Sequence, residues 1–412
     1  MASVDAPFDA AVTGIGMITP AGGDTAATWE RVRAAAGTAA LPVPALAGSR
    51  ADFGCWMPGF DAAAALGRRK AWRLDRSSQL AVAAADEALA ASGLDPASWD
   101  GDRVGVVLGC GVGGAGTWEK QHNVFLEQGP QQVSAMLVPM LVVNMSAGYV
   151  AMRIGARGPN FVTATACASG TTAVGAAREL LRNGTCDVVI TGGAESCLVQ
   201  PIICGFQQMG ALSGRRDEPT AASRPFDVHR DGFVPAEGAA VLVLERPRSA
   251  RERGARIHAY ISGYGASADA HNATAPDPEG AGAELALRAA LRDADLAPSA
   301  VDHVNAHGTS TRLNDEIEAR MIRRVLGEGP VVTSVKGVVG HSLGAAGAIE
   351  AALTALAMEQ QVIPPTANLE SQDPRIDLDV CTKAERSTRV EAAVSNSFGF
   401  GGQNAVLVFT RA

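Results

Sequence analysis

A single cysteine stands where a predicted strand gives way to a predicted helix. The segment FVTATACASGTTAVGAARELLR ends its strand at a tight turn, and Cys167 opens the helix that follows. The unpaired N–H groups and the dipole of a helix N-terminus favour an anion, so we expect a lowered thiol pKa and a reactive thiolate near neutral pH. Because an isolated buried cysteine is often only a packing residue, this position by itself leaves a structural role open.

Two histidines follow predicted strands in the second half of the chain. His307 lies in VNAHGTSTRLND and His341 in SVKGVVGHSLGAAG, and the small residues around them cannot cover an imidazole, so we expect two exposed rings. Parallel strands end at one edge of a sheet, and Cys167, His307 and His341 can therefore converge in one crevice. For either histidine alone a buried, hydrogen-bonded ring is an equal alternative, but the repeated pattern favours a functional pair.

This set of groups suits carbon–carbon bond formation between thioesters. A thiolate accepts an acyl group as a thioester, and a malonyl-type thioester that loses CO₂ leaves an enolate whose oxygen must be stabilised. Two imidazole N–H groups aimed at one carbonyl would stabilise it, and backbone N–H groups of Cys167 and of SFGFGGQN would hold the second oxyanion. Lys336 could pair with Glu350 and bias the imidazole protonation, with a surface lysine as the alternative.

The elements around these residues alternate between strand-like and helix-like patterns, which predicts an α/β fold. Helices are expected at 78–92, 281–294, 314–326 and 344–360. A second series from about residue 256 resembles the first, since both open on an apolar strand ending in glycine (AVTGIG and YISGYG) and close on two strands. We predict an internal duplication with halves 1–254 and 255–412 and an inserted loop region near 195–239; two unrelated α/β domains are the alternative.

The composition is that of a soluble globular protein, because 47% of the 412 residues are hydrophobic and 19% are charged. No leader-like or membrane-spanning stretch stands out in the sequence, so we expect a cytoplasmic protein. Seven scattered cysteines without a CxxC pair, and seven histidines without an HExxH pair, predict neither disulfides nor a metal site. The formal net charge of −8 argues against binding to nucleic acid or to anionic membranes.

Five motifs together resemble a known family. TACASG, RDGF, HGTST, KGVVGHSLGAAGAIE and NSFGFGGQN resemble the β-ketoacyl-acyl-carrier-protein synthases of the elongating type II class, over essentially the whole chain. The resemblance implies the thiolase fold, with two similar βαβαβαββ halves forming a five-layered αβαβα core. It implies Cys167 as acyl acceptor and His307 and His341 as donors for decarboxylation, supported by Lys336 with Glu350. It also implies a dimer, and substrates carried on the phosphopantetheine of an acyl carrier protein with no other cofactor.

Further positions take roles from the same resemblance. Phe400 is similar to a gating phenylalanine whose N–H joins that of Cys167 in an oxyanion hole. The residues that would bind substrate are Val112 and Phe206 in the acyl pocket, Thr274, Thr309 and Thr311 at the phosphopantetheine, and Met136 and Leu137 where a partner subunit closes the pocket. The apolar residues among them could equally fill the core.

The chain departs from the family where fatty-acid enzymes tend to place cations for docking the carrier protein. GPQQ, with Gln131 and Gln132, and FQQMG replace basic segments, and Lys70 and Arg73 in RRKAWR remain as docking candidates. These losses suggest a dedicated carrier and chain elongation in a type II polyketide pathway built from discrete proteins. The partner would be a second copy or a homologous chain-length-factor subunit, and housekeeping fatty-acid elongation is the alternative.

Other functions fit the residues less well. A chain-length factor, a noncatalytic subunit with the same fold, lacks the nucleophile that Cys167 would supply. A thiolase would need a second cysteine in the GFGG segment, where this chain has none, and an initiating synthase would pair histidine with asparagine. A cysteine hydrolase stays open as an alternative.

Overall fold

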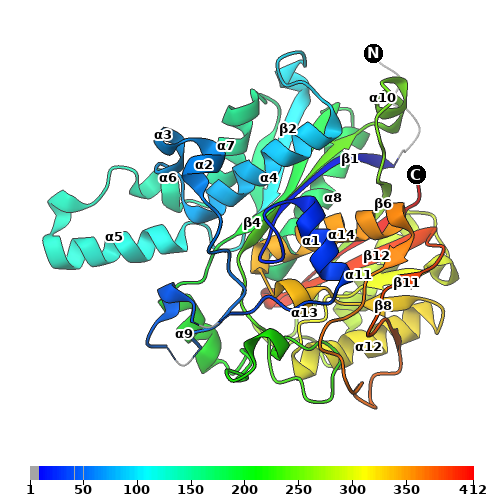
Figure 1. Cartoon of the computed structure of the whole chain (residues 1–412). Helices are drawn as coiled ribbons and strands as arrows, with labels where there is room; N and C mark the ends of the chain where they lie inside the picture. The colour runs from blue at the N-terminus through cyan, green and yellow to red at the C-terminus, as the bar shows by residue number, and fades with distance from the viewer. Residues whose placement is uncertain (1–8, 41, 50) are drawn as a thin grey trace.

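Two series of five strands have the same order in space (Figure 1). The structure is a computed structural model that describes residues 9–40, 42–49 and 51–412. The first series runs β3-β2-β4-β5-β1 and consists of β1 (Ala10–Ile18), β2 (Val104–Gly109), β3 (Asn160–Thr163), β4 (Val188–Glu195) and β5 (Gly238–Glu245). The second runs β8-β7-β12-β13-β6 and consists of β6 (Ala259–Ala268), β7 (His303–Asn305), β8 (Val331–Thr333), β12 (Ala392–Gly399) and β13 (Gln403–Thr410). The strand order therefore repeats between the two halves.

The pairing directions repeat as well. In each series the first three strands of the spatial order are parallel, and the last two are antiparallel to their neighbours. β1 and β6 pair antiparallel over a short stretch, with Ala10 opposite Ile261, and join the two series edge to edge. Short extra strands are β10 (Asp379–Val380), which pairs with β8, and β9 (Val362–Ile363), which pairs with β11 (Arg386–Ser387).

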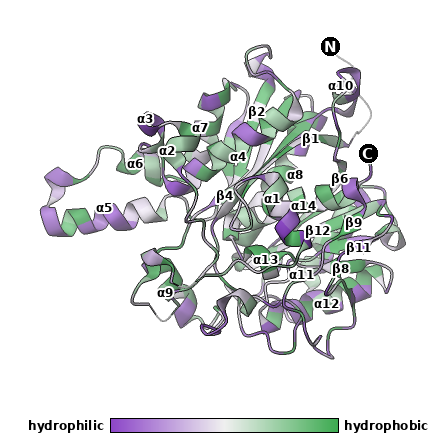
Figure 2. Cartoon of the chain, in the orientation of Figure 1, coloured by the Kyte–Doolittle hydropathy of each residue, from purple (hydrophilic) through white to green (hydrophobic). Residues whose placement is uncertain are grey.

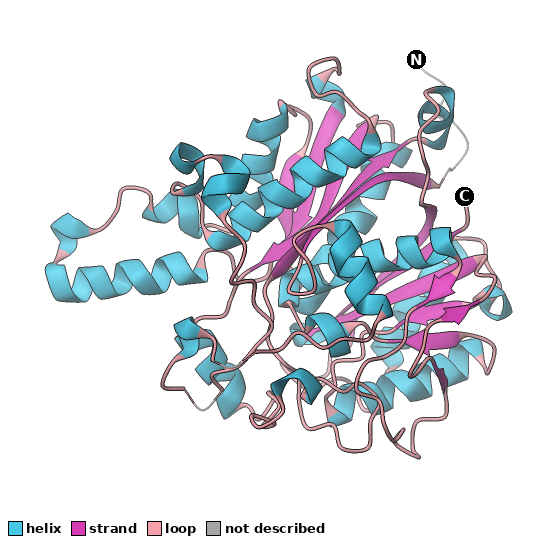
Figure 3. Ribbon diagram, viewed as in Figure 1, coloured by secondary structure: helices cyan, strands magenta, loops and turns pink. Residues whose placement is uncertain are grey.

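Helices cover both faces of each series and make five layers, αβαβα (Figure 1, Figure 3). The outer helices are α4 (Arg76–Ser92) and α7 (Met145–Ile154) on the first series, and α11 (Ala281–Asp293) and α12 (Arg312–Leu326) on the second. α8 (Ser169–Arg182) and α14 (Ala346–Gln360) lie between the two series and contact each other. The predicted helices match α4, α11, α12 and α14 within two residues at each end, and the fold implied by the sequence motifs is confirmed.

Glycines in the first strand of each half let a helix pack closely on that strand. A Cβ at Gly16 would lie 2.0 Å from the backbone oxygen of Ala84 in α4, and a Cβ at Gly265 would lie 2.1 Å from that of Ala286 in α11. Both distances are far inside van der Waals contact, so neither position accepts a side chain. The AVTGIG and YISGYG patterns thus mark the same helix-on-strand contact in both halves.

α14 is apolar on all sides because it lies in the middle layer. Every residue from Ala346 to Met358 is buried, whereas α12 keeps an exposed polar face. A helix that is enclosed on all sides needs no polar stripe. A charged side chain in it must find a buried partner, and Glu350 is such a side chain.

The remaining helices include a projecting arm. They are α1 (Thr25–Arg33), α2 (Ala62–Leu66), α3 (Arg68–Ala71), α5 (Ala115–Gln128), α6 (Leu137–Leu141), α9 (Gln200–Gln208), α10 (Pro247–Glu252) and α13 (Lys336–Val339). α5 projects from the body of the molecule and leads back through α6 (Figure 1), and Figure 2 shows α5 banded in hydrophilic and hydrophobic residues. Exposed apolar side chains on this arm are Trp118, Phe125, Leu126 and Val138. In the described part of the chain, no helix is long and apolar enough to cross a membrane.

Candidate active site

The turn that presents Cys167 is held in a strained conformation. β3 and α8 are joined by a segment with a short 3-10 turn, Ala166–Ala168, that contains Cys167. Ala166 has a φ of 50°, in the left-handed region that a side chain disfavours. The Ser169 hydroxyl accepts the Thr165 N–H at 2.9 Å and donates to the Ala166 carbonyl at 2.6 Å, which fixes the turn. Cys167 therefore stands at the start of α8, as predicted.

The backbone of Phe400 approaches Cys167 because Gly399 has no side chain. A Cβ at Gly399 would lie 3.0 Å from the Cys167 nitrogen and 2.8 Å from the Thr165 oxygen. The chain then turns sharply, with a φ of 79° at Gly401. As a result the backbone N–H groups of Phe400 and of Cys167 itself lie near the Cys167 sulfur and act to lower its pKa. Two N–H donors at this place suit an oxyanion that forms on an acyl-thioester.

Burial raises the pKa of the Cys167 thiol to about 11, although the Lys336 cation and the Phe400 N–H act in the opposite direction. The expectation of a lowered pKa is therefore wrong. Cys167 is only 9% exposed, and the loss of water around a thiolate outweighs the fractional charge of a helix N-terminus. At rest the Cys167 side chain is therefore a neutral thiol, and any attack by its sulfur requires the loss of that proton.

Alkylation of Cys167 should follow this raised pKa. Since the thiolate is the reactive form, we expect the rate with iodoacetamide to rise about tenfold per pH unit between about pH 7 and pH 10, without a plateau. Peptide-resolved mass spectrometry of Cys167 after timed exposure measures this rate. Free cysteine is the control, because its rate levels off above a pKa of about 8.5. A plateau for Cys167 near neutral pH would contradict a neutral resting thiol.

His307 and His341 meet edge to face, with ring centroids 5.4 Å apart and an interplanar angle of 84°. They are buried, at 2% and 3% exposure, so the expectation of exposed rings is wrong. Aromatic rings from other segments cover them. The ring centroids of Phe398 and His307 lie 5.8 Å apart, and those of Phe233 and His341 lie 5.3 Å apart. Burial, reinforced by the Lys336 charge, lowers the pKa of both histidines well below its usual value. Each ring is therefore neutral and offers one N–H donor and one acceptor.

Lys336 sets the position of the proton on His307. Its ammonium pairs with the Glu350 carboxylate, donates to the His307 carbonyl at 2.6 Å and lies 3.4 Å from His307 Nδ1. An ammonium only donates, so Nδ1 is an acceptor and the ring proton lies on Nε2. Lys336 is 1% exposed, and burial raises the pKa of Glu350 to about 7 in spite of the lysine. The predicted contact of Lys336 with Glu350 is confirmed, and the surface-lysine alternative is wrong.

Two groups of contacts that hold the histidines in place were not predicted from the sequence. The Glu318 carboxylate accepts the backbone N–H of His307 and that of the next glycine, both at 2.8 Å, and fixes the turn after β7. The backbones of Val234 and Ala236, between β4 and β5, hydrogen-bond His341 on both sides at 2.8 and 3.0 Å. Glu318 could have been predicted from the sequence as a functional residue, because it is an acid on the buried face of α12. The contact of Val234 could not have been predicted, because only backbone groups make it.

One cavity of about 440 Å³ collects most of the predicted site residues. Its lining includes Cys167, Phe206, Thr274, His307, Thr309, Thr311, His341 and Phe400. The Thr309 and Thr311 hydroxyl oxygens lie 2.9 Å apart, and the Phe206 and Phe400 rings lie 6.1 Å apart. Lys336 and Glu350 do not line this cavity. Lys336 contacts His307, and both residues act on the cavity through that histidine.

Val112, Met136 and Leu137 are not part of this cavity lining. Val112 is 36% exposed, and its N–H donates to the Glu195 carboxylate at 3.2 Å. Met136 and Leu137 are half-exposed and lie at the start of α6, on the projecting arm. Of the two predicted acyl-pocket residues, the structure of one chain thus places Phe206 in the cavity and leaves Val112 outside it, together with the predicted partner-facing residues Met136 and Leu137.

The fold and this cysteine-histidine site define an acyl-transferring enzyme of the thiolase fold. The chain belongs to the β-ketoacyl synthase family, because the model of the beta-ketoacyl synthase N-terminal domain matches residues 8–250 and that of the C-terminal domain matches residues 258–370. Two similar curated proteins are named 3-oxoacyl-acyl-carrier-protein synthase 2. That of Synechocystis sp. is 41% identical over 97% of either chain, and that of Staphylococcus aureus is 41% identical over 97% of this chain and 100% of its own.

Solved structures agree with this assignment. The ishigamide ketosynthase/chain length factor superposes with a TM-score of 0.93 and 32% identity over 99% of this chain and 100% of that one. A type II PKS acyl-carrier protein in complex with its ketosynthase gives a TM-score of 0.91 and 30% identity, again over 99% and 100%. A beta-ketoacyl synthase from Burkholderia phymatum gives 0.92 and 34%, over 98% and 99%.

Proposed function

We propose that this protein is a β-ketoacyl-acyl-carrier-protein synthase that joins an acyl group on Cys167 to malonyl-acyl carrier protein by decarboxylative Claisen condensation. The main support is that Cys167, His307 and His341 line one cavity. The charge states also suit the reaction. Both imidazoles are neutral, so each can donate its one N–H to an enolate oxygen without first losing an extra proton.

The first step loads Cys167. Its sulfur bonds to the carbonyl carbon of an acyl-phosphopantetheine thioester while its proton passes to a neutral imidazole of the cavity. The carbonyl oxygen becomes an oxyanion between the N–H groups of Cys167 and Phe400. Collapse of this intermediate breaks the bond to the pantetheine sulfur, which leaves with the proton. The high pKa of Cys167 makes a proton acceptor necessary in this step.

The second step forms the carbon–carbon bond. The thioester carbonyl of the malonyl group accepts N–H bonds from His307 Nε2 and from His341, and the carboxylate leaves as CO₂. The enolate carbon then attacks the acyl carbonyl on Cys167, whose oxygen returns to the N–H pair of Cys167 and Phe400. The Cys167 sulfur is expelled as the leaving group and takes up one proton from solvent, which restores the thiol. The lengthened 3-oxoacyl chain remains on the carrier protein.

The substrates arrive on the phosphopantetheine of an acyl carrier protein, and we assign no other cofactor. Thr274, Thr309 and Thr311 line the cavity and offer hydroxyl groups to the amides of that arm. We assign carrier docking to Lys70 and Arg73, which are exposed cations on and directly after α3. Among the described residues, no group of three or more His, Cys, Asp or Glu side chains is placed to hold a metal ion.

A dimer is supported by exposed apolar surface on the projecting arm and at the edge of the sheet. The arm of α5 and α6 exposes large apolar side chains, and Phe161 is 38% exposed on β3, which ends the sheet. An open strand edge and an apolar patch of this kind are usually covered by another chain. Met136 and Leu137 would then close the pocket of the partner. The partner is a second copy or a homologous chain-length-factor subunit.

A type II polyketide pathway is our first assignment. It is supported by Gln131 and Gln132 in place of docking cations and by the two similar solved structures whose titles name a chain length factor and a type II PKS. Housekeeping fatty-acid elongation is the second candidate. The curated relatives named 3-oxoacyl-acyl-carrier-protein synthase 2 favour it, because they are more similar, at 41% identity.

Two further expectations belong to this proposal. The halves 1–254 and 255–412, with an inserted region near 195–239, are supported by the repeated strand order and by family matches that end at 250 and begin at 258. A cytoplasmic location is supported by seven free cysteines, which are typical of a reducing compartment.

A condensation assay with the purified full chain tests the function. With hexanoyl- and malonyl-loaded carrier proteins we expect CO₂ release and a 3-oxoacyl product two carbons longer than the primer, read by intact mass of the carrier. The chain is assayed alone and with a homologous chain-length-factor subunit, against fatty-acid and polyketide carriers. Activity of the homodimer with a fatty-acid carrier would overturn the polyketide assignment. No product in any combination would overturn the synthase assignment.

A further inference from the structure

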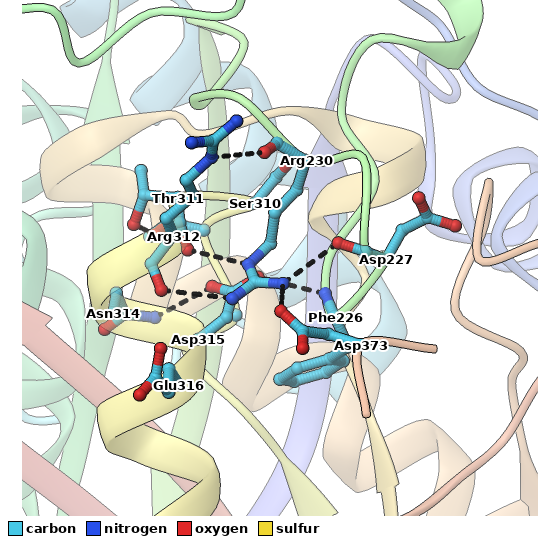
Figure 4. Close-up of polar contacts among 12 residues, drawn as sticks. Phe226, Asp227, Arg230, Ser310, Thr311, Arg312, Asn314, Asp315, Glu316 and Asp373 are labelled. Atoms are coloured by element: carbon cyan, nitrogen blue, oxygen red, sulfur yellow. Dashed lines mark hydrogen bonds and ion pairs between the residues drawn. The ribbon is translucent and has the colours of Figure 1, made fainter. Parts of the chain in front are cut away.

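Arg230 is a buried arginine whose side chain makes polar contacts with Thr311, Arg312 and Asp373 (Figure 4). It is 1% exposed, and the three residues that follow it, 231–233, line the cavity. Its guanidinium donates to the backbone carbonyls of Thr311 and Arg312, each at 3.1 Å, and to the Asp373 carboxylate at 2.8 Å. One side chain therefore ties the wall 231–233 to the wall 309–312.

The wall that contains Thr309 and Thr311 has a strained turn between them. Ser310 has a φ of 67°, in the left-handed region that residues with a side chain rarely adopt. This turn brings the hydroxyls of Thr309 and Thr311 to 2.9 Å from each other. The Ser310 carbonyl accepts the N–H of Gly232 at 3.0 Å, so the wall after Arg230 also holds the turn. A strained turn of this kind persists only where the surrounding contacts fix it.

Arg230 does not lie at the start of α12 in order to stabilise that helix. The N-terminus of a helix has a partial positive charge, which favours acids and disfavours a cation. Arg230 nevertheless binds carbonyls at the first residues of α12, with the compensating carboxylates of Asp315 at 3.6 Å and Asp373 at 2.8 Å. The guanidinium thus fixes the position of the Thr311 and Arg312 carbonyls.

We propose that Arg230 is a positioning residue that sets the distance between the two walls of the cavity mouth for the phosphopantetheine arm. The inference rests on the proposed function and deepens it, because it assigns part of the affinity for the arm to a residue that does not touch it. A guanidinium reaches two adjacent carbonyls and a carboxylate at once in a planar fork. A lysine at this position would keep the charge and lose that geometry.

The test compares two acyl donors that differ only in the arm. Hexanoyl-phosphopantetheine has the full arm, and hexanoyl-N-acetylcysteamine lacks most of it. In Arg230→Lys we expect the rate constant for acylation of Cys167 by the long donor to fall at least about tenfold, and that for the short donor less than about threefold. Intact mass of the full chain measures both rates. A residue with only a structural role would lower both rates by the same factor.

Arg178→Lys is the matched control. Arg178 is also 1% exposed, donates to the Ile261 carbonyl at 3.0 Å and pairs with Asp293 at 2.6 Å, but it does not line or border the cavity. We expect it to leave the ratio of the two rates unchanged. Equal losses for both donors in Arg230→Lys would overturn the inference.

A second variant keeps the test decisive if Arg230→Lys does not fold. Asp373→Asn weakens the hold on Arg230 and should shift the ratio in the same direction by a smaller factor. An unchanged ratio of the long-donor rate to the short-donor rate in Asp373→Asn would overturn the inference. Loss of cooperative unfolding in both variants would also overturn it, because Arg230 would then be needed for folding itself. If the wild type is acylated by neither donor, the proposed function itself fails and the inference with it.

Discussion

Cys167→Ala is expected to abolish both acyl loading and condensation. Cys167 is the one cysteine in the cavity lining, and an alanine leaves no atom to hold the acyl group between the N–H groups of Cys167 and Phe400. Intact mass after incubation with hexanoyl-carrier protein should show no adduct, and no 3-oxoacyl product should form. Undiminished condensation in this variant would falsify the mechanism.

Cys167→Gln separates the two halves of the reaction. A glutamine amide fills the place of the acyl-thioester and offers its oxygen to the same N–H pair, so we expect condensation to be lost and decarboxylation of malonyl-carrier protein to continue. Release of labelled CO₂ measures this. Cys197→Ala is the control, because Cys197 is buried at 1% exposure beside Cys167 and should leave acyl loading intact. A Cys167→Gln variant without CO₂ release would place decarboxylation elsewhere.

His307→Ala and His341→Ala are each expected to slow decarboxylation by at least about 10²-fold, the usual effect of losing one oxyanion donor. Some loading of Cys167 should persist, because the N–H groups of Cys167 and Phe400 remain in place. CO₂ release from malonyl-carrier protein measures the first effect, and intact mass measures the second. Normal CO₂ release in both variants would remove the histidines from this step.

His303→Ala is the matched control for these variants. His303 is buried at 1% exposure on β7, and burial lowers its pKa to about 4, yet it bonds the Val331 carbonyl and stays outside the cavity. Its loss should lower stability and leave decarboxylation per folded molecule unchanged. Because the pKa of His307 and of His341 is also lowered, protonation of these imidazoles should give the wild-type decarboxylation rate no inflection near the ordinary histidine value of about 6.5; an inflection near 7 would belong to Glu350.

The candidate site residues could be predicted from the sequence because each lies in a local pattern. Cys167, His307 and His341 all stand at strand ends next to small residues, and such positions are visible in the order of residue types. The repeated glycines of the first strands could be predicted in the same way, since the contact with a helix allows no side chain there. The fold class and the candidate nucleophile could therefore be predicted from the sequence.

The state of these residues was decided by the tertiary structure. The thiol pKa of Cys167 and the coverage of His307 and His341 depend on how much water other segments exclude, and no local pattern reports that. The expected thiolate and the expected exposed rings were wrong for this reason.

The supporting contacts also came only from the fold. Glu318 binds the turn of His307 from α12, Val234 holds His341 through backbone groups, and Arg230 spans 81 residues of sequence to the Thr311 carbonyl. A carbonyl is the same in every residue, so a sequence cannot show which carbonyl a side chain will meet. The sequence alone determined that Cys167 would open a helix and could meet two histidines in one crevice. The folded chain decided that all three side chains are neutral at rest, because burial disfavours their charged forms.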